Sequence, residues 1–200
     1  MTSFNIVGKP TPLIDAPEKV SGLATYVADI RVPNMLEAKV LRSPHPHARI
    51  LHIDTSESER LPGVKSVITA KDCPTSRWGW SNLKDQSILA EGKVRFAGEE
   101  IAAVAAETLE IAQDAADLIR VEYEPLPAVF DPEEAMTKGA PLIHDRSENI
   151  AYEVHIERGD PDNVLKTAAA VHEATYTTQL QYQAYMEPIG SVAKPEGHGR

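Results

Sequence analysis

The sequence has little cysteine and no long hydrophobic run. Cys73 is its only cysteine, which excludes an internal disulfide and an iron–sulfur cluster held by four thiolates of this chain. The longest purely apolar run, residues 101–106, is far shorter than the roughly 20 residues that a membrane-spanning helix needs. The N-terminus also lacks the charged start and apolar centre of a secretory signal. We therefore expect a cytoplasmic protein without a membrane partner, and any redox cluster on another polypeptide or region.

Lysine and arginine are also scarce. The chain has 20 of them against 30 Asp and Glu, a net charge of -10, and no run of basic residues occurs. Because a polyanion would be repelled, we expect no nucleic-acid partner. The hydrophobic share of 42% and the charged share of 25% are typical of an ordinary globular protein of one domain or two small ones.

Common catalytic and nucleotide-binding motifs are missing. The sequence contains neither a GxGxxG nor a GxxxxGK loop. Cys73 has no helix start or basic flank to lower its pKa, which indicates an inert thiol. The paired carboxylates at 99–100 and 133–134 are better explained by solvation at a turn and by helix capping than by acid–base work. Trp78 and Trp80 can clamp a ligand, cover an interface or cover their own loop.

Three histidines stand close together in the stretch LRSPHPHARILHID, residues 41–54. In an extended chain His45, His47 and Arg49 lie on one side and His52 on the other. At most two imidazoles then converge, beside a permanent cation, and the spacing supplies no third metal ligand. We expect no metal here and interpret the histidines as structural or interface residues, since such imidazoles can bind backbone carbonyls where the neighbouring prolines disturb strand pairing.

Strand and helix patterns alternate from residue 35 to residue 123, which predicts an α/β (α+β) fold. Strands are predicted at residues 35–41, 64–70, 93–96, 101–106 and 119–123. The third and fourth are expected to form a hairpin around Gly98. Helices are predicted at 56–61, with capping-box spacing of Ser56 and Glu59, and at 108–120, where alanines widen an apolar face. The first twenty residues are expected to be irregular, and residues 71–90 to form a long exposed loop.

The composition changes from Pro125 onward. Four prolines and one short helix signal, with Asp131 as its cap, indicate a connector. A second unit then begins near residue 149, with a helix capped by Asp160 and an alternating strand at 174–183. Another strand is expected from residue 191, without a return strand. A lone pair of strands with an open edge is only marginally stable in water. We therefore expect another chain or further sequence to complete this unit.

Taken together, seven stretches resemble the molybdenum hydroxylase family, which includes the large subunits of xanthine dehydrogenases, aldehyde oxidoreductases, carbon monoxide dehydrogenases and aromatic acyl-CoA reductases. In order they are DAPEKVSGLATYVADI (15–30), LRSPHPHARILHID (41–54), LPGVKSVITAKD (61–72), KVRFAGEEIAAVAAET (93–108), VEYEPLPAVFDPEEA (121–135), GAPLIHD (139–145) and YMEP (185–188).

This resemblance implies an N-terminal arm (1–14), an α/β-hammerhead domain (15–128), a connector (129–148) and the beginning of a molybdopterin-binding domain (149–200). It implies a molybdopterin-type Mo cofactor held mainly by residues beyond this chain, which oxidises or reduces an electron-poor carbon of a small molecule. The expected partners are the remainder of the Mo-binding subunit and subunits or domains that carry 2Fe-2S clusters and FAD. The family's catalytic glutamate has no match here.

Gln183 and Glu187 are the two candidates for contact with the cofactor region. The family often has a histidine where this sequence has Gln183, which weakens any contact carried over to it. Glu187 fits the family pattern, and we interpret it as a buried structural carboxylate. On pattern alone, the polar face of 175–183 lines a cavity or forms the outer face of a sheet. No residue is assigned as catalytic or as a metal ligand.

The alternatives to a part of a molybdenum-dependent enzyme are a stand-alone hammerhead module without chemistry and a histidine-based metal binder. The substrate stays open, because the residues expected to shape the pocket are not in this sequence.

Overall fold

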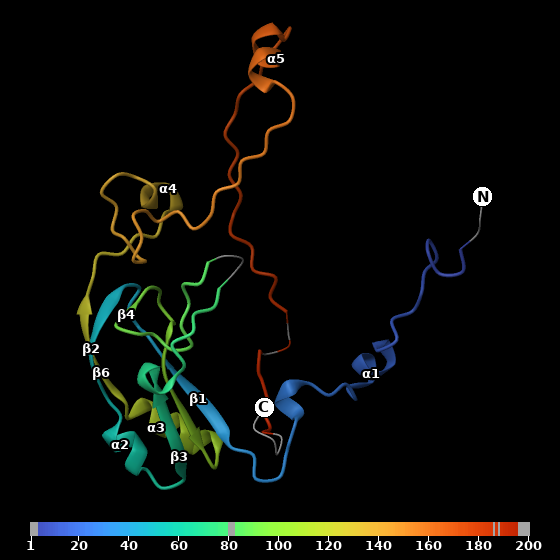
Figure 1. Cartoon of the computed structure of the whole chain (residues 1–200). Helices are drawn as coiled ribbons and strands as arrows, with labels where there is room; N and C mark the ends of the chain where they lie inside the picture. The colour runs from blue at the N-terminus through green and yellow to red at the C-terminus, as the bar shows by residue number, and fades with distance from the viewer. Residues whose placement is uncertain (1–3, 80–82, 186, 188, 196–200) are drawn as a thin grey trace. The chain divides into compact units, whose positions relative to one another are not determined.

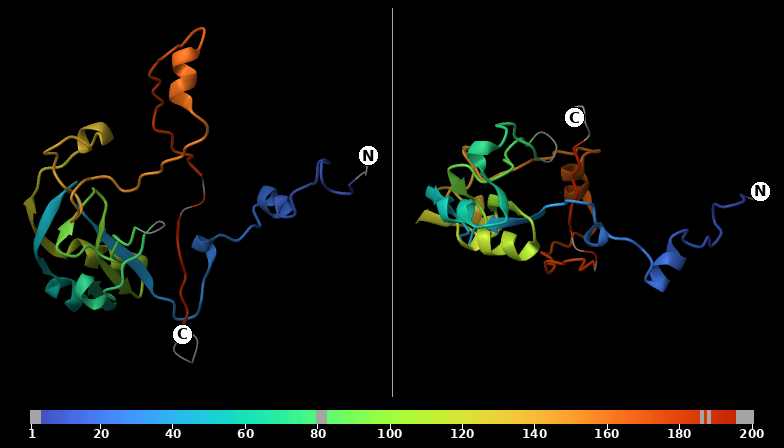
Figure 2. Two further views of the ribbon diagram at one scale, coloured as in Figure 1. Left: turned by 45° about the horizontal axis from the view of Figure 1, so that its top comes forward. Right: turned by 90° about the horizontal axis from the view of Figure 1, so that it is seen from below.

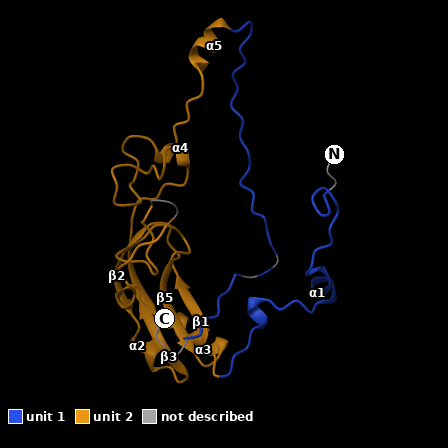
Figure 3. Ribbon diagram, turned by 45° about the vertical axis from the view of Figure 1, so that its right-hand side comes forward, with its two compact units in different colours: residues 1–33, 168–200 blue, residues 34–167 orange. Residues whose placement is uncertain are grey.

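The computed structural model describes residues 4–79, 83–185, 187 and 189–195. The chain divides into two compact units, one of residues 34–167 and one of residues 1–33 with 168–200 (Figure 3). All described strands and both hydrophobic cores lie in the 34–167 unit, so the α/β class predicted from the sequence is confirmed there.

The first sheet has β5 (Glu100–Ala106) at its centre (Figure 1). Its neighbours, β1 (Glu37–Arg42) and β3 (Val64–Thr69), both run antiparallel to it. Along β1 half-buried and exposed residues alternate, as expected for a strand with one face toward the core. The strands predicted at 35–41, 64–70 and 101–106 are therefore confirmed.

The second sheet has the order β4–β2–β6 and is also antiparallel. Its strands are β4 (Lys93–Val94), β2 (Ala48–Asp54) and β6 (Arg120–Pro125). The predicted hairpin of 93–96 with 101–106 is wrong, because β4 pairs with β2 and β5 belongs to the first sheet. The short strand-like runs predicted both strands but carried no information about this long-range pairing, and the strand β2 was not predicted.

Small side chains let a helix approach the first sheet closely. Helix α3 (Leu109–Asp117) lies along this sheet (Figure 2). Its alanines Ala115 and Ala116 form a buried cluster with Ala102 and Val104 of β5. Thr108 caps the helix by accepting a hydrogen bond from Ile111 N at 3.3 Å. The predicted alanine-rich helix face is confirmed.

Helix α2 (Ser56–Arg60) is present as predicted, but its predicted capping box is not. Thr55, one residue earlier, is the N-cap, and its hydroxyl donates to Glu59 at 2.6 Å. The carboxylate of Asp54 accepts from Ser56 N at 2.9 Å, which also lowers the pKa of Asp54. The Asp54 side chain at the end of β2 therefore provides a hydrogen-bond acceptor for the first N–H group of α2.

The long loop predicted over 71–90 is only partly exposed. It begins with a 3-10 turn, η2 (Ala70–Asp72), and Trp78 and Gln86 exchange two backbone hydrogen bonds of 2.9 Å. Leu89 and Ala90 are buried, and Ala90 packs in the core cluster of the second sheet. The expectation of exposure is thus wrong at these two residues. Trp80 lies outside the described residues.

The first twenty residues contain a helix that the sequence analysis missed. Helix α1 (Ala16–Ser21) has a proline in its first turn and ends at Gly22, whose φ of 73° is left-handed. A 3-10 turn, η1 (Val27–Asp29), follows, with the Asp29 carboxylate accepting from Tyr26 N at 3.0 Å. The prediction of irregular structure is therefore wrong for residues 16–21.

The two later helices begin where the sequence predicted them. In α4 (Pro132–Ala135) the Asp131 carboxylate accepts from the N–H groups of both following glutamates, at 2.8 and 2.9 Å. In α5 (Pro161–Thr167) the Asp160 carboxylate accepts from Asn163 N at 3.1 Å.

The strand predicted at 174–183 is wrong for this structure. These residues form neither helix nor strand, and every described residue from 150 to 195 is exposed. The described residues 191–195 likewise form no strand, and 196–200 lie outside the described part. An alternating pattern favours a strand, but a strand is stable only when it pairs with a neighbouring strand. No described strand pairs with this segment.

Burial of β5 predicts a large effect for Ile101→Ala, because Ile101 is 0% exposed at the point where β5 meets the second core cluster. Its truncation should cost about 2–5 kcal/mol of unfolding free energy, measured by urea denaturation of the purified protein. The same change at Ile156, which is 85% exposed, is the control and should cost under about 0.5 kcal/mol. Equal losses from both variants would contradict the described core.

Candidate functional site

The histidine stretch lies where β2 begins, and it binds backbone. His47 is buried, and its Nδ1 donates to the carbonyl oxygen of Pro127 at 2.6 Å, since a carbonyl can only accept. The backbone strengthens this contact, because Leu126 N donates to His47 O at 2.9 Å. The interpretation of these histidines as carbonyl binders is confirmed for His47.

The other two histidines, His45 and His52, do not converge on a common ligand. The His45 ring lies edge-on to Tyr123, with ring centroids 4.7 Å apart, and His52 is exposed on β2. Burial raises the pKa of Tyr123, while its contact with the Ser43 hydroxyl acts in the opposite direction. Within the described ranges no three His, Cys, Asp or Glu side chains are close enough to hold a metal ion.

The connector after β6 is folded around one asparagine. The Asn149 side chain accepts from Ile143 N at 3.1 Å and donates to the carbonyl oxygens of Ala135 and Pro141 at 3.1 and 2.8 Å. Three of its four hydrogen-bonding positions are therefore used within the connector. This side chain closes residues 135–149 into a compact loop.

Three consecutive residues then attach this loop to residues 85–93 of the same unit. Asp145 pairs with Lys93 at 3.0 Å, and this contact lowers the pKa of Asp145. Arg146 pairs with Asp85 at 2.9 Å, and His144 Nδ1 lies 3.8 Å from the same carboxylate. The connector thus has a defined position on residues 85–93.

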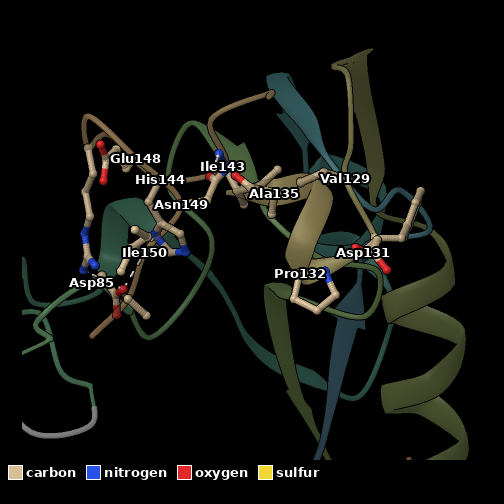
Figure 4. Close-up of a pocket in the computed structure, with 13 residues that line it drawn as sticks. Asp85, Val129, Asp131, Pro132, Ala135, Ile143, His144, Glu148, Asn149 and Ile150 are labelled. Atoms are coloured by element: carbon tan, nitrogen blue, oxygen red, sulfur yellow. Dashed lines mark hydrogen bonds and ion pairs between the residues drawn. The ribbon is translucent and has the colours of Figure 1, made fainter. Parts of the chain in front are cut away.

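A cavity of about 330 Å³ lies beside these contacts. Figure 4 shows Asp85, His144 and Glu148 on one side of it and Val129, Asp131 and Pro132 on the other. Its described lining contains no serine, threonine, cysteine or lysine, and its ionisable side chains are those of Asp85, Asp131, His144, Arg146 and Glu148. These carboxylates and the imidazole can form hydrogen bonds with a bound molecule.

His144 lines this cavity, and its ordinary pKa lies near neutral pH. Burial lowers its pKa, and the cations Arg95, Arg146 and Lys93 act in the same direction, while Asp85 opposes them. Burial therefore makes this imidazole harder to protonate than an imidazole in water.

The candidates Gln183 and Glu187 are not part of this cavity. Both are exposed and belong to the unit of residues 1–33 and 168–200. Glu187 is therefore exposed, whereas the sequence analysis expected it to be buried. The pKa of Lys19 is raised, chiefly by its 2.6 Å contact with Asp15 and to a smaller extent by the charge of Glu187. Met186 and Pro188 lie outside the described residues, and the roles predicted for Gln183 and Glu187 stay predictions.

One predicted surface carboxylate is buried instead. The side chains of Glu99 and Arg95 are only 12% and 9% exposed, and they form an ion pair at 3.4 Å. The Glu99 carboxylate also accepts from Arg95 N, which closes the turn around Gly98. Solvation therefore does not explain Glu99, whereas Glu100 forms an exposed pair with Arg42 at 2.6 Å.

Comparison with known proteins identifies this arrangement. Residues 21–127 match the family model of the aldehyde oxidase and xanthine dehydrogenase a/b hammerhead domain, which is more than half of the chain. The chain belongs to the aldehyde oxidase and xanthine dehydrogenase family. Residues 143–200 of this family member match a second model, the molybdopterin cofactor-binding domain. The resemblance and the hammerhead fold inferred from the sequence are confirmed.

Named members of the family show the same relationship. The chain is 41% identical over 196 residues to a probable xanthine dehydrogenase subunit of Bacillus subtilis, covering 97% of this chain and 26% of that protein. It is 37% identical to the nicotinate dehydrogenase large molybdopterin subunit of Eubacterium barkeri, covering 98% of this chain and 46% of that one. The chain therefore spans between a quarter and a half of the length of these relatives.

Solved structures of the family agree in fold. The aldehyde oxidoreductase of Desulfovibrio gigas superposes with a TM-score of 0.68 at 31% identity, over 80% of this chain and 19% of that one. The quinoline 2-oxidoreductase of Pseudomonas putida 86 gives the same TM-score at 34% identity, over 78% of this chain and 21% of that one.

The described residues of the segment that matches the cofactor-binding domain do not assemble a cofactor site in this structure. Every described residue between 150 and 195 is exposed, so no buried set of donors converges on a pterin-sized ligand. We derive no reaction step through the molybdenum group from these residues.

None of the helices in the described part of the chain is long and apolar enough to cross a membrane.

Sequence reasoning missed the residues that build the connector site. Asn149, Asp85 and Arg146 are ordinary polar residues in irregular segments, and no periodicity or motif marks them. Only GAPLIHD (139–145), quoted for the family resemblance, ends at the attachment point. The sequence feature that could have indicated this site is a short polar triplet, residues 144–146, which follows a proline-rich stretch.

The lowered pKa of His144 predicts a pH effect on stability. Its ordinary pKa is about 6.5, so on acidification the unfolded chain takes up a proton that the folded chain resists. The stability contributed by neutral His144 is complete above that pKa and is lost as the pH falls through it. Between about pH 7.5 and pH 5 the wild type should lose more unfolding free energy than His144→Gln, measured by urea denaturation at each pH.

His155→Gln, at an exposed position, is the matched control and should follow the wild type. A wild type that gained stability relative to His144→Gln on acidification would show that the imidazole is held as a cation.

Proposed function

We propose that this chain forms part of the molybdopterin-binding subunit of a molybdenum hydroxylase-type oxidoreductase. The observation that supports this most directly is the order of the two matches along one chain, the hammerhead model over 21–127 and the cofactor-binding model over 143–200. In this proposal residues 1–14 are an arm, 15–128 the hammerhead domain, 129–148 a connector and 149–200 the beginning of the cofactor-binding domain.

The proposed activity is two-electron oxidation or reduction of an electron-poor carbon in a small molecule. The molybdenum cofactor, when bound, supplies that redox chemistry, and iron–sulfur clusters and FAD on partner subunits or domains carry the electrons. The single cysteine supports the placement of clusters elsewhere, and relatives from Bacillus subtilis and Eubacterium barkeri are themselves named as subunits. We propose that the assembly works in the cytoplasm.

The role proposed for the described residues is to position the cofactor-binding part. The connector is held by Asn149 and attached through Asp145 to Lys93 and through Arg146 to Asp85. A fixed connector limits the directions in which the following segment leaves the hammerhead sheets. The loop therefore acts as a rigid start for the exposed residues after 150.

A stand-alone module without chemistry is the second candidate. Both hydrophobic core clusters lie within residues 34–167, which supports a body that folds without the cofactor-binding part.

Metal analysis of the purified intact protein, with the partners that copurify, separates the two. Cells supplied with molybdate should yield stoichiometric molybdenum, and cells starved of molybdate should yield the same complex without it. A fully assembled complex from molybdate-supplied cells that contains no molybdenum would overturn the enzyme proposal and favour the module.

A further inference from the structure

The N-terminal segment and the segment that carries Glu187 belong to one compact unit, although most of the chain lies between them (Figure 3). The first contains α1 and the 3-10 turn η1. The second lies within residues 143–200, which match the cofactor-binding model, whereas the hammerhead model already begins at residue 21. A contact between the two segments therefore joins parts of the chain that the family models separate.

The turn η1 is closed by its own hydrogen bonds. The Asp29 carboxylate accepts from Tyr26 N at 3.0 Å, and Asp29 N donates to Tyr26 O at 2.9 Å. The Arg31 guanidinium donates to the carbonyl oxygen of Ala28 at 2.8 Å. Local bonds thus fix the backbone of this turn, and the half-buried Val27 side chain packs against another segment.

Gly190 is the residue that Val27 meets. A Cβ atom at position 190 would lie 3.0 Å from Val27 Cγ1 and 3.7 Å from Val27 Cβ, and no other heavy atom apart from its chain neighbours lies within 4 Å of it in the described structure. The shorter distance is below the optimum of about 3.5–4.0 Å between two carbon atoms. Gly190 is not among the glycines with positive φ, so the close approach of Val27, and not the backbone conformation, explains a glycine here.

Unlike charges lie on the same two segments. Lys19 of α1 pairs with Asp15 at 2.6 Å, which is the chief cause of its raised pKa, and the charge of Glu187 raises this pKa to a smaller extent. Glu187 precedes Gly190 by three residues. Because Lys19 is exposed and its charge is screened by solvent, this attraction favours the orientation of the two segments more than it strengthens their contact.

We propose that residues 15–30 form an intramolecular docking element for residues 187–190, with Val27 packed against Gly190 and Lys19 near Glu187. The contact joins the N-terminal segment to the cofactor-binding part of the chain and restricts the movement of Glu187. It assigns residues 15–30 to that part by contact, although the domain limits proposed above count them with the hammerhead. This role goes beyond the proposed redox function and does not depend on it.

Cysteine cross-linking tests the contact directly. The 3.7 Å between the two Cβ positions lies within the range of about 3.5–4.5 Å found in disulfides. The variant carries Val27→Cys and Gly190→Cys, together with Cys73→Ser to remove the cysteine of this sequence. The purified intact protein is equilibrated in a glutathione redox buffer, and the disulfide is quantified by peptide mapping under non-reducing conditions. We expect an intramolecular disulfide between positions 27 and 190.

Leu23→Cys with Gly190→Cys, in the same background, is the matched control. Leu23 is 76% exposed, and none of its atoms lies within 4 Å of the Cβ position of residue 190. The effective concentration of the Val27 pair should exceed that of the control pair by at least about tenfold. Equal cross-linking of the two pairs, or a folded Val27 pair without an intramolecular disulfide, overturns the proposal.

Far-UV circular dichroism and the unfolding midpoint show whether the cysteine variants fold. If they do not, Gly190→Val decides, because its side chain displaces Val27 and should speed tryptic cleavage after Arg31 by at least about threefold. Ser191→Val adds the same side chain at the next, exposed residue and should change this rate by less than about twofold. Equal cleavage rates in these two variants would overturn the proposal. All of these readouts apply to protein with or without molybdenum, so their failure is distinct from a failure of the metal analysis.

Discussion

The burial of β5 on both of its faces is the constraint on which the rest of this structure depends. On one face Ala102 and Val104 meet the alanines of α3, and on the other Ile101 joins the cluster of Ala48 and Val94. Small side chains let the helix and the second sheet approach the same strand closely. Since β2 and β6 are held through this shared strand, so are His47 and the start of the connector.

Local pattern predicted most of the elements of this unit, and it failed where pairing is long-range. Strand-like runs were enough for β1, β3 and β6, and an apolar helical face was enough for α3, because these signals lie within a few consecutive residues. The pairing of β4 with β2 was missed because no strand was predicted at residues 48–54, where β2 lies, and because Lys93–Val94 is too short to indicate its partner. The connector site was missed for the same reason: Asp85 and Arg146 are far apart in sequence, and Asn149 satisfies three backbone groups without any motif.

In the segment after residue 150, the sequence favours a strand that the described residues do not form. Its alternating stretch favours a strand, and large apolar side chains such as Ile156, Tyr176 and Leu180 are exposed in the described chain. The match to a cofactor-binding domain over 143–200 gives these side chains a reason, because a domain core must bury them. We infer that this part gains its core from contacts that the described residues do not supply, whereas the hammerhead unit already has its own.

Native-state hydrogen exchange of the purified protein, read by mass spectrometry, tests the central position of β5 most directly. Amides of Glu100–Ala106, bonded on both sides to β1 and β3, should exchange slowest in the 34–167 unit and only through global unfolding. The edge strand β6 should exchange faster, through local opening. Exchange of β5 as fast as that of β6 would contradict the claim that the two cores depend on one shared strand.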